Sequence, residues 1–194
     1  MADVVAVDLA AKYSAACRFE DGYVQPTWQA DSWSATEHAF LTAITDFWLP
    51  PEYFTPGPDV LVVEDLPHRL PFANLVKRVC RMQGRIAERM ETVQQLDKLL
   101  YVAPAVWRKH FKGLERGTGP EAVIPVARDI GYFPPDLTPR IKKAGDKAIA
   151  KKVTTDYAAA FLIGVWAQDM HHRYGTFDGI PGADRYTYTG GKRG

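Results

Sequence analysis

The apolar residues of this chain form short runs that end at acidic residues. Residues 4–7 and 60–63 consist of Val, Ala and Leu, which is typical of strands buried on both faces. Asp8 follows the first run, and Glu64 and Asp65 follow the second. The pattern therefore predicts two interior strands, each with a carboxylate at its end.

The remaining pattern predicts a single α/β domain. Asp21-Gly22 favours a hairpin turn between strands, and residues 99–102 predict another short buried strand. The element order predicts an RNase H-like arrangement over residues 1–174, a mixed sheet with helices on both faces, followed by a flexible tail over 175–194. Helical apolar spacing or end signals predict helices at 36–48, 72–90, 104–111, 119–130 and 154–173, the last with Thr154 as its N-cap.

Composition narrows the class of protein. With 194 residues, of which 46% are hydrophobic, the chain has enough apolar material for one well-filled core. Cys17 and Cys80 give no disulfide framework, and neither a signal peptide nor an apolar run of membrane length is present. We therefore expect a cytoplasmic protein in a reducing compartment.

The net charge of +1 hides a strong segregation of charge along the chain. Three windows, 77–89, 105–116 and 138–152, contain 15 of the 24 Lys and Arg residues but only three acids. This distribution indicates a basic face that binds a polyanion such as nucleic acid, although solvated basic helices would have the same composition.

Three acids have positions that suit a metal site. Asp8 and Glu64 end buried strands, and Asp156 lies in the predicted first turn of an apolar helix. Carboxylates are the ligands that Mg²⁺ prefers, and paired ions can activate water against a phosphodiester. Each acid also has an ordinary structural interpretation: a turn cap at Asp8, a solvent-facing residue at Glu64, and a favourable charge near a helix N-terminus at Asp156.

Four segments, in order over roughly residues 3–170, resemble the RuvC-like Holliday junction resolvases of the RNase H-like superfamily, in particular their divergent bacteriophage members. Residues 5–8 and 62–64 resemble the first two catalytic segments. Residues 101–113 resemble a strand and helix whose basic residues approach the scissile phosphate, and residues 156–162 resemble the start of the last helix, which has the final catalytic Asp.

The resemblance implies a metal-dependent endonuclease that resolves four-way DNA junctions as a homodimer. Asp8, Glu64 and Asp156 would be catalytic residues and ligands of Mg²⁺, with Mn²⁺ able to substitute. Phe72, after the loop that follows Glu64, would enter the junction, or else act as a staple at the helix start. The DNA-binding candidates are otherwise basic: Arg78, Arg81, Arg85, Arg108, Lys109, Lys112, Lys142, Lys143, Lys147, Lys151 and Lys152.

Two features leave alternatives open. Val153 stands where the family usually has a further acid or His, so Asp146 or Asp65 would have to complete the metal site. The apolar stripe of the 72–90 helix, formed by Leu75, Val79, Met82, Ile86 and Met90, suits either ordinary core or a dimer seam. The rival functions are an endonuclease for flaps, forks or other branched DNA, and a junction-binding protein without catalysis.

Overall fold

The structure is a computed structural model that describes residues 1–9, 13–20, 23–25, 29–31, 59–65, 73–92, 98–115, 117–132 and 144–185. Several predicted features lie outside these residues. They are the Asp21-Gly22 turn, the 36–48 helix, Phe72, Lys142 and Lys143.

A mixed sheet forms the centre of the molecule, as the element order predicts. The strand order is β3-β2-β1-β5-β6-β7, and β4 pairs with β2. Strands β1, β5 and β6 are mutually parallel, whereas β2 is antiparallel to β1 and β7 is antiparallel to β6. The strands are β1 (Val4–Asp8), β2 (Tyr13–Glu20), β3 (Tyr23–Gln25), β4 (Gln29–Asp31), β5 (Val60–Glu64), β6 (Leu99–Val102) and β7 (Ala183–Arg185).

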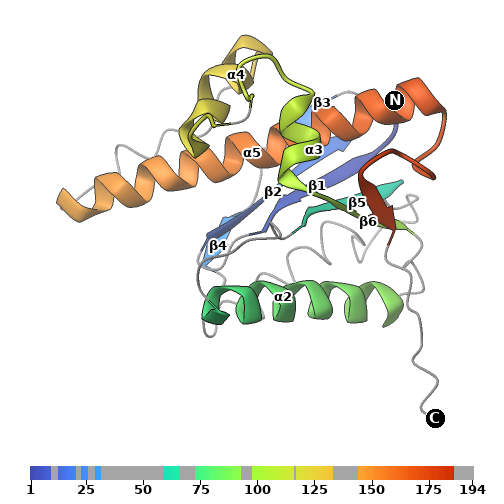
Figure 1. Ribbon diagram of the computed structural model, residues 1–194, viewed down its shortest axis with the longest axis horizontal. Coiled ribbons are helices and arrows are strands. Elements are labelled where there is room, and N and C mark those ends of the chain that lie inside the picture. Colours follow the sequence, from blue (N-terminus) through green and yellow to red (C-terminus); the bar gives the residue numbers. More distant parts are fainter. Residues whose placement is uncertain are drawn as a thin grey trace.

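Helices cover both faces of this sheet (Figure 1). The helix α2 (Ala73–Thr92) lies along one face, and α5 (Ala144–Tyr174) crosses the other. On the α5 side lie α3 (Pro104–Lys109) and α4 (Val123–Asp129), the latter preceded by the short helix η2 (Pro120–Ala122). The expectation of helices on both faces of a mixed sheet is confirmed.

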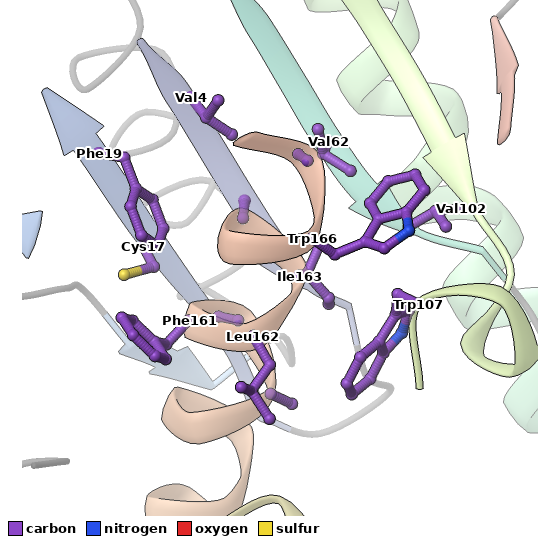
Figure 2. Close-up of a cluster of buried hydrophobic side chains, with 14 of the residues drawn as sticks. Val4, Cys17, Phe19, Val62, Val102, Trp107, Phe161, Leu162, Ile163 and Trp166 are labelled. Atoms are coloured by element: carbon purple, nitrogen blue, oxygen red, sulfur yellow. The ribbon is translucent and has the colours of Figure 1, made fainter. Parts of the chain in front are cut away.

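Strand alternation divides the core into two layers. Val4 and Ala6 of β1 belong to the cluster on the α5 side, whereas Val5 and Val7 belong to the cluster beneath α2. Strand β5 alternates in the same way, so Val62 joins the α5-side cluster (Figure 2). This regular alternation fixes which face the residue at the end of each strand occupies.

The middle of α5 is enclosed on all sides. Every residue from 156 to 164 is buried, and Phe161 stacks on Phe19 of β2 with ring centroids 5.6 Å apart. A Cβ added at Gly164 would lie 2.0 Å from Cε2 of Phe19, so glycine permits the close crossing of helix and strand. No helix in the described residues is long and apolar enough to cross a membrane.

The apolar stripe of α2 is ordinary core. Val79, Met82, Ile86 and Met90 are at most 3% exposed and belong to the cluster on the α2 face of the sheet. The side chain of Leu75 lies outside the described residues. The prediction of a dimer seam through these residues is therefore wrong, because the sheet already covers them.

Two predicted boundaries in the last third of the chain are also wrong. The helix α5 begins at Ala144 and not at Thr154, because the preceding residues are rich in Ala and Lys, which favour helix even without an apolar stripe. The predicted tail includes β7, which extends the sheet beside β6. Phe177 and Ile180 anchor this segment in the core with exposures of 6% and 2%.

Candidate active site

The register of the parallel strands places Asp8 beside Glu64. Val7 of β1 pairs with Val63 of β5, so the next residue of each strand lies at the same end of the sheet. Both acids have the parity of Ala6 and Val62, whose side chains face α5. The two carboxyl groups hydrogen-bond to each other on that face.

The third acid comes from the helix that covers this face. Asp156 is only 5% exposed and Asp8 only 8% exposed, which is low for carboxylates. Asp156 lies close enough to Glu64 for its charge to influence the titration of that residue. Because α5 begins before Ala150, Asp156 occupies the helix interior, and a favourable position in the first turn does not explain it.

Burial is the largest influence on Glu64 and raises the pKa of its carboxyl group, and the charge of Asp156 raises it further. Hydrogen bonds to Asp8 and Trp107 and the charge of Arg108 oppose this rise. Two carboxyl groups in hydrogen-bond contact need a proton or a cation between them. The site therefore concentrates negative charge in a place where a bound cation would stabilise it.

Trp107 is a site residue that the sequence did not identify. Its indole Nε1 donates a hydrogen bond of 2.8 Å to Oε1 of Glu64, and the side chain is 1% exposed. Strand β6 ends at Val102 and the helix α3 begins at Pro104. This short connection brings Trp107 close to the end of the sheet at which Asp8 and Glu64 lie. A Trp near the start of a helix that follows a buried strand was the available signal.

The donor set fits a hard divalent cation. Asp8, Glu64 and Asp156 offer only oxygen ligands, the type that Mg²⁺ prefers, and they would hold the ion between β1, β5 and α5. As the side chains are placed, no group of three or more His, Cys, Asp or Glu residues in the described part of the chain could hold a metal ion. The contact between the carboxyl groups of Asp8 and Glu64 is the one that a cation would replace.

Neither proposed fourth ligand joins these three acids. Asp65 has the opposite strand parity to Glu64, and it accepts a hydrogen bond of 3.1 Å from Gln83 of α2. Asp146 lies on α5 ten residues before Asp156, and this spacing separates their backbones by about 15 Å. The expectation that Asp65 or Asp146 completes the site is therefore not supported, and Val153 is one helical turn from Asp156.

Three of the predicted DNA-binding residues come together at one cavity. Arg108, Lys109 and Lys112 line one cavity on α3 and the turn after it, and the charge of Arg108 acts on Glu64. Arg81 and Arg85 are exposed on α2, across the sheet from this cavity. The described basic residues of the windows 77–89 and 105–116 therefore do not form one continuous face, contrary to the expectation from composition.

Four further basic candidates are placed by their backbone alone. Lys147, Lys151 and Lys152 lie on the first turns of α5, on the N-terminal side of Asp156, and Arg78 lies on α2. Their side chains are outside the described residues.

Comparison with solved structures identifies the fold. The chain has an RNase H-like fold, and its structure is similar to that of T. thermophilus RuvC in complex with a Holliday junction substrate. That match has a TM-score of 0.59 and 13% identity, and it covers 91% of this chain and 98% of that chain. Thermus thermophilus RuvC alone matches with a TM-score of 0.54 and 14% identity over 90% and 97% of the two chains. No protein-family model matches this sequence, and no curated protein matches it significantly.

Proposed function

We propose that this protein is a divalent-metal-dependent endonuclease that resolves Holliday junctions by phosphodiester hydrolysis. The convergence of Asp8, Glu64 and Asp156 on one face of the sheet is the observation that carries the proposal. Two of these carboxyl groups, those of Asp8 and Asp156, are buried, and burial of a charged group is costly unless a counter-charge compensates it. The similarity of the fold to T. thermophilus RuvC in complex with a Holliday junction substrate supports the choice of substrate.

The acids and their neighbours would divide the work. Asp8, Glu64 and Asp156 bind Mg²⁺, for which Mn²⁺ can substitute, and the bound metal supplies an activated water and neutralises charge on the phosphate. Trp107 fixes the orientation of Glu64 through its hydrogen bond. Arg108, Lys109 and Lys112 bind the scissile phosphate and its neighbours. These three residues line one cavity, and the charge of Arg108 acts on Glu64.

A homodimer belongs to the same proposal, because two symmetric cuts suit a two-fold protein. Because the apolar stripe of α2 is buried against the sheet, the solvent-exposed face of α2 is the candidate dimer interface. Lys77 and Arg81 are exposed before Gly84, and Glu88 and Glu91 are exposed after it. An antiparallel pairing of two α2 helices about Gly84 would set Lys77 opposite Glu91 and Arg81 near Glu88 of the second copy.

Charge reversal tests this pairing. Arg81→Glu and Glu88→Arg should each shift the protein toward monomer in light scattering, and the double variant should restore the dimer. A monomeric wild type at micromolar concentration, or a double variant no better than either single one, would contradict it.

Cleavage of synthetic DNA tests the main proposal. The wild type should make paired cuts in a four-way junction in Mg²⁺ and leave a linear duplex of the same sequence intact, while Asp156→Asn should bind the junction without cutting it. A 5′ flap and a fork, tested alongside, separate the alternatives. Cutting of these two but not of the junction would reassign the substrate, and binding without cutting in both Mg²⁺ and Mn²⁺ would remove the catalytic role.

A further inference from the structure

The helix α3 contains two of the groups that act on Glu64. Nε1 of Trp107 donates a hydrogen bond of 2.8 Å to the carboxyl group of Glu64, and the charge of Arg108 also acts on it. The position of α3 therefore determines the surroundings of one of the three acids. A contact that fixes α3 from outside the site also affects the site.

The helix α3 depends on the rest of the fold for its position. It has six residues, and no side chain caps its N-terminus. Isolated helices shorter than about 12 residues are marginal in water. Trp107 and Phe111 are buried in the cluster on the α5 side, but apolar contacts are not directional. A polar contact would fix the orientation of α3 more closely.

Such a contact with α5 lies directly after α3. Nε2 of His110 is 2.8 Å from Oδ2 of Asp169, and the imidazole N–H donates because a carboxylate oxygen accepts. The side chain of His110 is 21% exposed and that of Asp169 is 54% exposed. Pairs with this exposure contribute little to global stability, so the effect of this pair should be local to α3.

Two contacts connect His110 to Trp107. The backbone N–H of His110 donates a hydrogen bond of 3.1 Å to the carbonyl oxygen of Trp107. The ring of Phe111 meets the ring of His110 edge-on with centroids 5.0 Å apart, and it meets Trp107 with centroids 6.5 Å apart. A displacement of His110 would therefore reach the indole through the backbone and through the Phe111 ring.

The helix α5 is thus connected to the acids in two ways. It contains Asp156, which is one of them, and α3 lies against it (Figure 1). Asp169 is 13 residues further along α5, which separates the two backbones by about 20 Å. From this distance, Asp169 is connected to Glu64 through His110 and Trp107.

We propose that His110 is a positioning residue for Glu64: its contact with Asp169 holds α3 so that the indole of Trp107 stays bonded to the Glu64 carboxyl group. His110 acts through Trp107 and not as a metal ligand. The role of Glu64 in binding a metal rests on the proposed function, whereas the placement of the indole does not.

Hydrogen exchange of the Trp107 indole N–H tests this placement without metal or DNA. In isotope-labelled protein in EDTA, NMR follows this N–H, whose signal is assigned by its loss in Trp107→Phe. His110→Ala should accelerate its exchange by about threefold, as expected for loss of one hydrogen bond. His110→Gln retains a side-chain N–H donor and should keep the wild-type rate. An unchanged rate in His110→Ala would overturn the proposal.

Asp169 provides a matched pair of variants on α5. Asp169→Ala should accelerate the exchange of the indole as His110→Ala does, and Asp169→Asn, which retains an acceptor oxygen, should not. Alanine favours helix more than aspartate, so a weaker α5 would not explain a faster indole in Asp169→Ala. The backbone amide of Val62, in the middle of β5, reports global unfolding. Equal acceleration of that amide would contradict a local role.

Manganese binding tests the step from the indole to the metal. EPR of free Mn²⁺, titrated with the protein in the absence of DNA, should show about threefold weaker binding for His110→Ala and about tenfold weaker binding for Trp107→Phe. The double variant should bind no more weakly than Trp107→Phe, because His110 acts through the indole. Additive losses, about thirtyfold in the double variant, would contradict this route.

The two experiments separate this proposal from the proposed function. Faster indole exchange in His110→Ala, together with no Mn²⁺ binding by the wild type, would keep the placement of Glu64 by His110 and remove the metal site. Mn²⁺ binding by the wild type, together with an unchanged indole in His110→Ala, would overturn the placement alone.

Discussion

Two neighbouring acids at the end of β5, Glu64 and Asp65, lie on opposite faces of the sheet and have different surroundings. Glu64 faces α5 and shares a buried site with Asp8 and Asp156, where burial raises its pKa. Asp65, the next residue, accepts a hydrogen bond from Gln83 on the α2 side. Two consecutive residues thus have different roles: Glu64 lies in a cluster of acids, whereas Asp65 hydrogen-bonds to α2.

The helices on these faces differ in a corresponding way. The helix α2 has one buried stripe and one exposed face, which is the pattern of a helix that covers a sheet. The helix α5 is buried on all sides over residues 156–164. This buried stretch begins at Asp156, which is one of the three acids of the candidate active site. We therefore assign a structural role to the α2 face and the chemistry to the α5 face.

A charge placed in the α2 stripe should have the largest effect on stability. Met82→Glu puts a carboxylate at a position that is 3% exposed, so it should lower the free energy of unfolding by about 4 kcal/mol or leave the protein unfolded. Cys80→Glu, on the exposed side of the same helix, should change it by less than about 0.5 kcal/mol. Urea denaturation measures both. A well-folded, equally stable Met82→Glu protein would show that the stripe is not core.

Two helical glycines provide the next comparison. Gly164→Ala on α5 would collide with Phe19 and should cost about 1–3 kcal/mol of stability. Gly84→Ala on α2 meets nothing within 4 Å and should add about 0.5–1 kcal/mol, because alanine favours helix over glycine. Chemical denaturation of both variants is sufficient, and effects of the same sign would contradict the difference between the two helices.

The pattern of apolar residues predicted much of this structure because it is local. Buried runs located β1 and β5, and the position of the acids at their ends located Asp8 and Glu64. The pattern did not decide whether Glu64 or Asp65 faces the site, because that depends on register with a neighbouring strand. It did not locate β7 either, since three residues among glycines and tyrosines form a strand only when β6 supplies the pairing edge.

Trp107 was missed for a related reason. It lies in the basic window 105–116, where the charged residues drew the interpretation, and its hydrogen bond to Glu64 joins residues 43 positions apart. Likewise, the α2 stripe has the same spacing whether a sheet or a second subunit covers it. The role of Trp107 and the surface that covers the α2 stripe both depend on contacts between distant segments. These contacts cannot be read from a single sequence.

Trp107, whose indole N–H donates a hydrogen bond to Glu64, provides a test with a smaller expected effect. Trp107→Phe removes the donor to Oε1, so the Mg²⁺ concentration for half-maximal cleavage should rise by about tenfold. Trp166→Phe alters another nearly buried indole, at 2% exposure on the same face, and controls for lost packing. Titration of cleavage with Mg²⁺ separates them, and equal shifts in both variants would reduce Trp107 to a packing residue.

The smallest expected effect concerns Val153, which lies one helical turn before Asp156. Val153→Asp adds a carboxylate one helical turn away on α5, so it should lower the Mg²⁺ requirement by roughly threefold, equivalent to about 0.7 kcal/mol. Val153→Asn has a similar size without the charge and is the control. If neither variant changes the requirement, the three acids already bind the metal without a fourth ligand at this position.

The measurement that tests the central claim most directly compares two neighbours, Glu64→Gln and Asp65→Asn, in cleavage of a four-way junction with Mg²⁺. Both variants remove one negative charge from the same strand end. Loss of a metal ligand should reduce the rate of Glu64→Gln by at least about a hundredfold, whereas Asp65→Asn should stay within about twofold of wild type. Equal losses in the two variants, or full cleavage by Glu64→Gln, would contradict the assignment of chemistry to the α5 face.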